Sequence, residues 1–258
     1  MKYEPIISQL KTLNPLVLNL TNYVSMDFVA NGLISLGASP IMSESAEEVE
    51  DLLKISQALV INIGTLNQAF IARAETACMH ANALNIPIIL DPVGAGATAY
   101  RTQTAVNLLQ NYKIALVRGN ASEIMALAGE AVQTKGVDSL AVSLDAETAA
   151  TALSKQYQCV VLVSGVTDVI VSGSKITHLS EGSPMMPKVV GTGCLFTAVT
   201  AAFCAAMPDD FYEAAQASAW YYGRCGALAA QKSSGPGSFK MHFLDQLDNL
   251  LLEMKHAT

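Results

Sequence analysis

The segment Ile-Pro-Ile-Ile-Leu at residues 86–90 runs directly into Asp-Pro-Val-Gly-Ala-Gly-Ala-Thr at residues 91–98. A short, nearly continuous apolar run that ends at a turn is typical of a strand buried on both faces of a parallel sheet. The segment Cys-Val-Val-Leu-Val at residues 159–163 shows the same pattern and is followed by Ser164. In parallel sheets, ligands bind beyond the carboxyl ends of the strands, so the residues that follow each strand are the candidates for function.

Strand-like and helix-like segments alternate on both sides of this stretch. The expected strands cover residues 15–21, 38–42, 58–64, 86–90, 114–118, 159–164 and 169–172, and the expected helices include residues 45–57, 67–84 and 146–157. Ser45 and Glu48 have the spacing of a capping box, and Asp145 stands where an N-cap is expected. Residues 192–251 are expected to form one helix after another. This alternation predicts an α/β fold, and we expect a single domain over residues 1–258.

The composition is acidic and apolar: 51% of the residues are hydrophobic, 14% are charged, and the net charge is −7. Because lysine and arginine are scattered singly, we expect no nucleic-acid partner and no attraction to a membrane surface. The most apolar stretch, residues 195–207, is shorter than the about 20 residues of a membrane span and predicts a buried helix. So few charges leave an apolar surface, which favours a homo-oligomer.

Five cysteines occur without a Cys-x-x-Cys pair, namely Cys78, Cys159, Cys194, Cys204 and Cys225. An odd number without metal-ligand spacing favours free thiols in a reducing compartment. The first residues lack the apolar core of a signal peptide, so we expect a cytoplasmic location. Four of the cysteines fit as small core residues, whereas Cys194 stands beside glycines at a predicted helix start.

Asp91 follows the strand at residues 86–90 and precedes a glycine-containing turn. A carboxylate at a strand end can hold a hydrated cation beside a ligand, but it can equally bond to the backbone of its own turn. The strand at residues 114–118 ends in Arg118, whose guanidinium suits phosphate oxygens. Glu123, in the next helical turn, is a candidate for binding Mg²⁺ through water. It can also simply complete a capping box with Asn120.

The segment Gly191-Thr192-Gly193-Cys194 precedes the apolar helix and is called the glycine turn here. Glycines let successive backbone N–H groups point to one spot at a helix N-terminus, which forms an anion hole. Such donors suit the oxygens of a transferred phosphoryl group. The alternative is a tight loop that only leads into the helix. At the first helical turn, Cys194 is expected to point into the same anion site and to accept a proton from a hydroxyl group.

Five separated motifs together resemble the hydroxyethylthiazole kinases of thiamine biosynthesis and salvage. They are LTNYVSMDFVANGLISLGASPIM at residues 20–42, DPVGAGAT at 91–98, RGNASEI at 118–124, GTGC at 191–194 and GPGSFKMHFLDQL at 235–247. The resemblance runs from about residue 14 to residue 251. It implies a ribokinase-like three-layer α/β/α fold with a mostly parallel central sheet. It also implies ATP- and Mg²⁺-dependent phosphorylation of the alcohol of 4-methyl-5-(2-hydroxyethyl)thiazole, and a homotrimer with the thiazole sites at the subunit interfaces.

The resemblance assigns roles by motif. It places Asn22, Met42 and Gly191 against the thiazole, Arg118 and Ser164 against ATP, Asp91 and Glu123 around Mg²⁺, and Cys194 where most ribokinase-like sugar kinases carry an aspartate base. The residues support two of these roles independently. Met42, at a strand's carboxyl end, offers a soft apolar platform for a flat ring. Asn22, just past a strand, can bond to a ring nitrogen or merely close a turn.

Three positions depart from the family pattern: Ser164 replaces a threonine, Tyr23 an asparagine and Val166 a charged residue. A hydroxymethylpyrimidine or pyridoxal kinase is the nearest alternative, but those enzymes begin with a glycine-rich first loop, and this chain has Asn22 and Tyr23 there. A second alternative is a nucleotide or thiazole sensor without turnover, since Cys194 replaces the aspartate. Phosphoryl transfer depends mainly on positioning and charge, which favours an enzyme.

Overall fold

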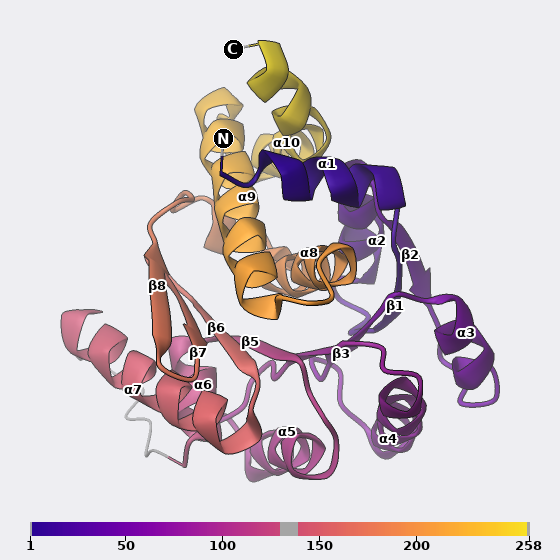
Figure 1. The fold of residues 1–258 in the computed structure, drawn as a ribbon. Coiled ribbons are helices and arrows are strands. Elements are labelled where there is room, and N and C mark those ends of the chain that lie inside the picture. Colours follow the sequence, from indigo (N-terminus) through magenta and orange to yellow (C-terminus); the bar gives the residue numbers. More distant parts are fainter. Residues whose placement is uncertain (1, 130–138, 257–258) are drawn as a thin grey trace.

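The computed structural model describes residues 2–129 and 139–256, and within them the strands form one eight-stranded sheet (Figure 1). The strands are β1 (Leu16–Leu20), β2 (Ser39–Met42), β3 (Ala58–Asn62), β4 (Ile88–Asp91), β5 (Leu116–Asn120), β6 (Val160–Ser164), β7 (Asp168–Ser172) and β8 (Lys175–Leu179). Their order is β2-β1-β3-β4-β5-β6-β7-β8. The first six run parallel, and β7 and β8 add an antiparallel edge.

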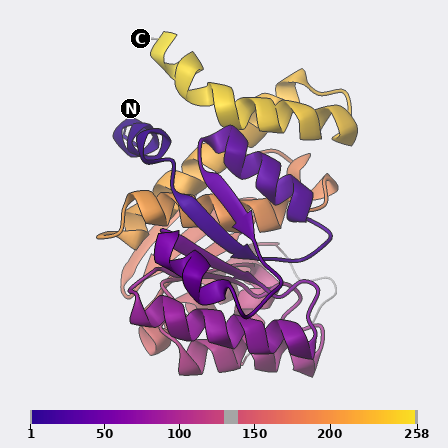
Figure 2. The same ribbon diagram turned by 90° about the vertical axis from the view of Figure 1, so that its right-hand side faces the viewer.

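Helices cover both faces of the sheet, so the molecule has three layers (Figures 1 and 2). One face carries α3 (Val49–Ile55), α4 (Gln68–Ala83), α5 (Ala99–Asn111), α6 (Ala121–Leu127) and α7 (Ser139–Tyr157). The other carries α1 (Glu4–Leu13), α2 (Met26–Leu36), α8 (Thr192–Ala206), α9 (Phe211–Lys232) and α10 (Pro236–His256), and the short 3₁₀ helix η1 (Met186–Lys188) precedes α8. The predicted three-layer α/β/α architecture with a mostly parallel sheet is confirmed.

Successive strand residues face opposite layers, and both sides are buried. In β3, Val60 packs into the apolar cluster on the α8 side, whereas Leu59 and Ile61 pack into the cluster under α4 and α5. All three side chains are at most 1% exposed. This double burial explains why the strands appear in the sequence as continuous apolar runs rather than as alternating patterns.

Helix α8 lies between the sheet and the outer helices α1, α2 and α9 (Figure 1). Every residue from 195 to 206 is buried, which confirms the buried helix expected at residues 195–207. Its small side chains, mainly alanine and threonine, allow the neighbouring helices to approach closely. In the part of the chain that the structure describes, no helix combines the length and the apolarity needed to cross a bilayer.

Two predicted helix caps are wrong. Helix α3 begins only at Val49, and Glu48 is its N-cap without a side-chain bond, because its carboxylate instead accepts a hydrogen bond from Ser43 at 2.6 Å. The Ser45 hydroxyl bonds to Glu47. Asp145 lies inside α7, which begins six residues earlier at Ser139, and its side chain is exposed. In contrast, Asn67 caps α4 through its side chain, close to the predicted helix start.

Candidate active site

Polar side chains gather where the carboxyl ends of β1, β3 and β4 meet the N-terminus of α8. The chain runs from β1 to β2 on one side, whereas it runs from β3 to β4 on the other. The gap between β1 and β3 is therefore the topological switch point, where α/β sheets bind ligands. Asn22 lies two residues beyond β1, and Asn62 and Asp91 are the last residues of β3 and β4. Each of the three is at most 4% exposed. Their burial requires that their polar atoms be paired or reserved for a ligand.

The glycine turn forms the start of α8, as expected, and two of its glycines are required by close contacts. Gly191 is the N-cap with φ of 92°, a left-handed conformation that favours glycine, and an added Cβ would lie 3.0 Å from Cβ of Ser25. A Cβ on Gly193 would lie 2.9 Å from Nη1 of Arg118. The first N–H groups of a helix lack intrahelical acceptors, and glycine offers no side chain to cap them. The turn therefore presents free donors beside a guanidinium.

The strand predicted at residues 114–118 is β5 at Leu116–Asn120, so Arg118 lies inside it, two residues before its end. Arg118 is 8% exposed, and its Nη2 donates a hydrogen bond to the hydroxyl of Ser164 at the end of β6. Its guanidinium carbon lies 5.1 Å from the ring centre of Phe196. Among residues 2–129 and 139–256, no carboxylate lies within ion-pair distance of it, and its Nε has no hydrogen-bond partner. The charge of Arg118 acts on Asp91 and Asp168 from a distance, but neither carboxylate is in ion-pair contact with it. A buried cation in this state beside an anion hole is suited to a phosphate group.

Two aromatic residues that the sequence did not single out support this arrangement. Phe196 stacks on Tyr222 of α9 with a centroid distance of 4.6 Å and an interplanar angle of 2°. The hydroxyl of Tyr222 donates to the carbonyl of Thr192 at 2.6 Å. The same aromatic pair thus lies under the guanidinium and holds the first residue of the helix. In the sequence, nothing distinguishes these rings from other buried aromatics.

Asn22 connects the first strand with the glycine turn. Its Nδ2 donates to Sγ of Cys194 at 3.1 Å and to Oδ1 of Asn62 at 2.9 Å, and its Oδ1 accepts from the backbone of Ser25 at 3.1 Å. Both amide protons of Asn22 are therefore used inside the protein. A bond from Asn22 to a thiazole nitrogen would require one of these to be given up, whereas Cys194, which is only partly buried, remains accessible beside it.

Asp91 faces the same group of residues through one of its oxygens. Its Oδ2 accepts hydrogen bonds of 2.8 Å from Asn62 and from Thr197 of α8. Its Oδ1 has no partner among the described residues. Burial raises the pKa of Asp91 to about 6, although the nearby Arg118 and the two hydrogen bonds act in the opposite direction. The alternative of an aspartate bonded to its own turn is therefore wrong, because both donors come from other elements.

Glu123 has the structural role that the sequence left open, and it has a second contact as well. It forms a capping box with Asn120 at the start of α6. Its Oε1 also accepts the backbone N–H of Gly94 at 2.9 Å, which ties the loop after β4 to α6. The negative charge of Glu123 acts on Asp91, so the two carboxylates lie within electrostatic reach of one another. Together they offer oxygen ligands of the kind that Mg²⁺ prefers.

The remaining predicted residues occupy the expected places. Met42 ends β2 and is partly buried against the apolar cluster that contains α8, against which Cys194 also packs. The other four cysteines (Cys78, Cys159, Cys204 and Cys225) are free and buried, as predicted. Burial raises the pKa of Cys78 to about 12, which makes this thiol unreactive.

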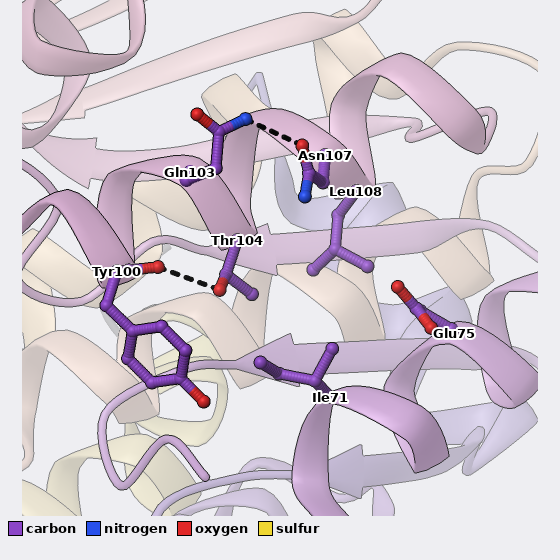
Figure 3. A pocket seen from close by; sticks show the side chains of 7 residues that line it. All are labelled: Ile71, Glu75, Tyr100, Gln103, Thr104, Asn107 and Leu108. Carbon is purple, nitrogen blue, oxygen red and sulfur yellow. Dashed lines mark hydrogen bonds between the residues drawn. The ribbon is translucent and has the colours of Figure 1, made fainter. Parts of the chain in front are cut away.

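A shallow groove between α4 and α5 contains none of the predicted site residues (Figure 3). It is lined by Ile71, Glu75, Tyr100, Gln103, Thr104, Asn107 and Leu108. Several of its polar groups already bond within α5, since Gln103 donates to Asn107 at 2.7 Å and Thr104 to the carbonyl of Tyr100 at 2.8 Å. Nothing in the groove requires a ligand, so the strand ends remain the candidate site.

Comparisons with known proteins show which family this chain resembles. The model of the hydroxyethylthiazole kinase family matches residues 7–253. A hydroxyethylthiazole kinase from Brachyspira hyodysenteriae is 48% identical over 95% of this chain and 92% of its own length. The solved structure of a hydroxyethylthiazole kinase protein from Pyrococcus horikoshii is 32% identical, has a TM-score of 0.88, and the match covers 96% of this chain and 94% of that one.

More distant structures share the fold alone. A ribokinase-like superfamily protein from Enterococcus faecalis is 13% identical, with a TM-score of 0.70, and the match covers 94% of this chain and 88% of that one. The fold of the chain is therefore ribokinase-like.

Proposed function

The chain belongs to the hydroxyethylthiazole kinase family, and from this premise we propose that its phosphoryl transfer takes place at the glycine turn. The reaction is the ATP-dependent phosphorylation of the hydroxyl group of 4-methyl-5-(2-hydroxyethyl)thiazole, for the biosynthesis or salvage of thiamine diphosphate. One observation carries the assignment of the site: the buried guanidinium of Arg118 has no carboxylate partner among the described residues and lies against Gly193. That position suits the charge of a transferred phosphoryl group.

The nucleotide side of the site is proposed to consist of Arg118, Ser164 and the backbone of the glycine turn. Arg118 neutralises phosphate oxygens, and the N–H groups of Gly193 and Cys194 bind the equatorial oxygens of the group in transfer. Ser164, bonded to Arg118, holds the guanidinium at the strand end and offers its hydroxyl to the nucleotide. Because the donors belong to a helix N-terminus, their direction is set before ATP binds.

A magnesium ion is proposed to accompany ATP, and the donor set fits it. Asp91 keeps one buried oxygen without a partner, and Glu123 lies close enough to act on it electrostatically. Within the described residues, no group of three acidic, histidine or cysteine side chains forms an all-protein metal site. Two carboxylates are nevertheless enough for Mg²⁺, which keeps waters and phosphate oxygens as its other ligands. When bound, the ion supplies positive charge to the phosphates; Asp91 and Glu123 would hold it.

The thiazole alcohol is proposed to bind beside Asn22, Met42 and Gly191, with its hydroxyl directed toward Cys194. The thiol accepts a hydrogen bond from Asn22, so its position is set by a buried amide. In this arrangement the thiolate form of Cys194 receives the proton of the hydroxyl group as the substrate oxygen attacks the γ-phosphorus and ADP leaves. A loose transition state leaves little work for a base, so a thiol is sufficient.

We further propose a homotrimer with the thiazole sites at the subunit interfaces. Next to Asn22 and Gly191, three apolar side chains are strongly exposed in the single chain: Tyr23 at 57%, Val24 at 71% and Val190 at 73%. Exposed apolar side chains beside a site favour burial in an interface with another subunit. Sedimentation equilibrium should give three times the mass of the chain. A reducing cytoplasmic location is proposed from the five free cysteines.

The test of the function compares two alcohols as substrates in parallel. Purified protein with ATP and Mg²⁺ should release ADP when hydroxyethylthiazole is added, and much more slowly with hydroxymethylpyrimidine. A preference for the pyrimidine would reject the proposed substrate. Thiazole binding without ADP release above background would instead identify a sensor.

A further inference from the structure

Asn62 is a buried polar residue at the centre of the site, to which neither sequence motifs nor the proposed reaction assign a role. It ends β3 and lies directly opposite Asp91 of β4 in the register of the sheet. Its side chain is 1% exposed, so its polar atoms depend on partners inside the protein. A buried amide that only stabilises the core would bond locally, as Asn19 does to the carbonyl of Val17 in its own strand.

The partners of Asn62 lie after β1, directly after β3 and at the end of β4. Its Oδ1 accepts from Nδ2 of Asn22 at 2.9 Å and from the backbone of Gly64 at 3.0 Å. Its Nδ2 donates to Oδ2 of Asp91 at 2.8 Å. The donor and acceptor ends of the amide therefore have separate tasks. Aspartate could accept from Asn22 but could not donate to Asp91, and leucine could do neither.

The contact with Gly64 shows how tightly this junction is built. A Cβ added to Gly64 would lie 2.9 Å from three atoms of the Asn22 side chain. The backbone after β3 thus presses against the same amide that Asn62 holds by a hydrogen bond. Asn22 has no space to take another orientation on this side.

At its other end, Asn62 determines which oxygen of Asp91 is available. Asn62 and Thr197 both donate to Oδ2, and Oδ1 remains without a partner among the described residues. At the opposite end of the chain of bonds, the second proton of Asn22 goes to Sγ of Cys194. Through Asn22, the amide of Asn62 thus links the thiol beside the substrate with the carboxylate on the metal side.

We propose that Asn62 is a positioning residue with two roles. The side-chain oxygen of Asn62 orients Asn22, and through it Cys194, toward the thiazole alcohol. The side-chain nitrogen of Asn62 orients Asp91 toward the side of the site that would hold the metal ion and the phosphates. This inference rests on the proposed function and adds to it a residue that touches neither substrate. Its two ends predict two separable effects.

The test uses two substitutions at this position and one matched control. Asn62→Leu removes both ends of the amide at similar volume. Asn62→Asp keeps an oxygen for Asn22 and Gly64 and replaces the donor to Asp91 by a second carboxylate oxygen. Asn19→Leu makes the same change as Asn62→Leu in the adjacent strand, at a residue that is also 1% exposed. Urea unfolding of each variant first establishes that it folds.

Thiazole binding is measured by calorimetry without ATP or Mg²⁺, and the Mg²⁺ concentration for half-maximal rate is measured with saturating substrates. Asn62→Leu should weaken thiazole binding about tenfold, the loss expected for one buried hydrogen bond, and should raise the Mg²⁺ requirement. Asn62→Asp should alter only the Mg²⁺ requirement and leave thiazole binding within about twofold of the wild type. Asn19→Leu should change neither quantity.

Two results would overturn the inference. In the first, Asn62→Leu loses stability but keeps the wild-type affinity for thiazole and the wild-type Mg²⁺ requirement, as Asn19→Leu does. Asn62 would then be a core residue only. In the second, Asn62→Asp weakens thiazole binding as much as Asn62→Leu, and the two ends are then not separable. If Asn62→Leu does not fold, the Asn62→Asp variant alone decides. A wild type without thiazole-dependent ADP release would reject the proposed function itself, and the inference with it.

Discussion

The guanidinium of Arg118 lies over the ring of Phe196, with 5.1 Å between its central carbon and the ring centre. The ring provides the negative face that a buried cation needs while no phosphate is bound. Because a ring is a weaker partner than a carboxylate, the charge of Arg118 stays available for a ligand. The pair explains how a kinase of this kind can keep an arginine buried and reactive toward phosphate at the same time.

Arg118→Ala should raise the KM for ATP by about tenfold or more, because charge-assisted hydrogen bonds to phosphate are lost. The KM for the thiazole alcohol should change little, since that substrate lies on the Asn22 side. Steady-state kinetics with each substrate varied in turn provides the measurement. An unaltered KM for ATP would count against a phosphate contact of Arg118.

Phe196→Leu should raise the KM for ATP about threefold to tenfold, because the guanidinium loses the ring beneath it. Phe203→Leu is the matched control: Phe203 is buried in the same helix and packs on Tyr221, with 5.9 Å between the ring centroids. Both variants should lose similar unfolding free energy in urea, but only Phe196→Leu should affect ATP. Equal KM values in the two variants would show that the ring only fills space.

Cys194→Asp should retain or raise kcat, because a carboxylate accepts a proton at this position and can still receive the hydrogen bond from Asn22. Cys194→Ala, which removes the acceptor, should be the slower of the two. The rates are compared at saturating ATP and thiazole alcohol. A large loss of kcat in Cys194→Asp would show that the thiol has a specific role or that the site rejects the charge.

Glu123→Ala should raise the Mg²⁺ concentration needed for half-maximal rate and leave thiazole binding nearly unchanged. The same substitution also removes the capping box with Asn120 and the bond to Gly94, which should cost about 1 kcal/mol of unfolding free energy. Glu123→Gln removes the charge and keeps one oxygen, which can accept from Gly94 or from Asn120 but not from both, so it retains part of the structural role. If the Mg²⁺ dependence of both variants matches the wild type, Glu123 does not belong to the metal site.

Asp168→Asn should remove the part of the pH dependence of the unfolding free energy that comes from the titration of Asp168. Burial raises the pKa of Asp168 to about 6, although the hydrogen bond from the Gly165 backbone and the charge of Arg118 both act to lower it. An acid with a raised pKa binds its proton more readily in the folded than in the unfolded protein, so the wild type loses stability as pH rises from about 4 to about 6. The full effect is on the order of 3 kcal/mol.

Urea unfolding of both proteins at pH 4, 5, 6 and 7 tests this expectation. The stability of Asp168→Asn relative to the wild type should increase over this range, because asparagine can still accept from Gly165 and carries no charge. A difference that stays constant with pH would show that Asp168 titrates normally. Asp91 is present in both proteins, so its own titration cancels.

The parallel strands and the helical C-terminal region could be predicted because their apolar runs are long and buried on both faces. Strand β8 could not, since it is an edge strand, and Lys175 and His178 on it are exposed. The cap predicted at Ser45 failed because Ser43 competes for Glu48, and sequence spacing does not rank such competitors. The cap predicted at Asp145 failed because the helix begins earlier in the chain.

Sequence reasoning singled out residues that lie in recognisable motifs and missed those that act through partners. Asn62 left a weak signal, a polar residue in an otherwise apolar run, but the strand was predicted to extend to residue 64, so a search along predicted strand ends did not reach it. Thr197 left none, because a threonine in an apolar helix is usually a core residue. Its hydrogen bond to Asp91 depends on the position of α8 across the sheet, which only the folded structure reveals.

The depth of α8 has a consequence for engineering. Residues 195–206 are all buried, so the helix that carries the glycine turn tolerates little change in volume without disturbing the packing of both neighbouring layers. Libraries that aim to redirect the enzyme toward other alcohols should therefore leave this helix untouched. Diversity belongs in the segment after β2, where an exposed polar side chain such as Glu44 can vary at little energetic cost.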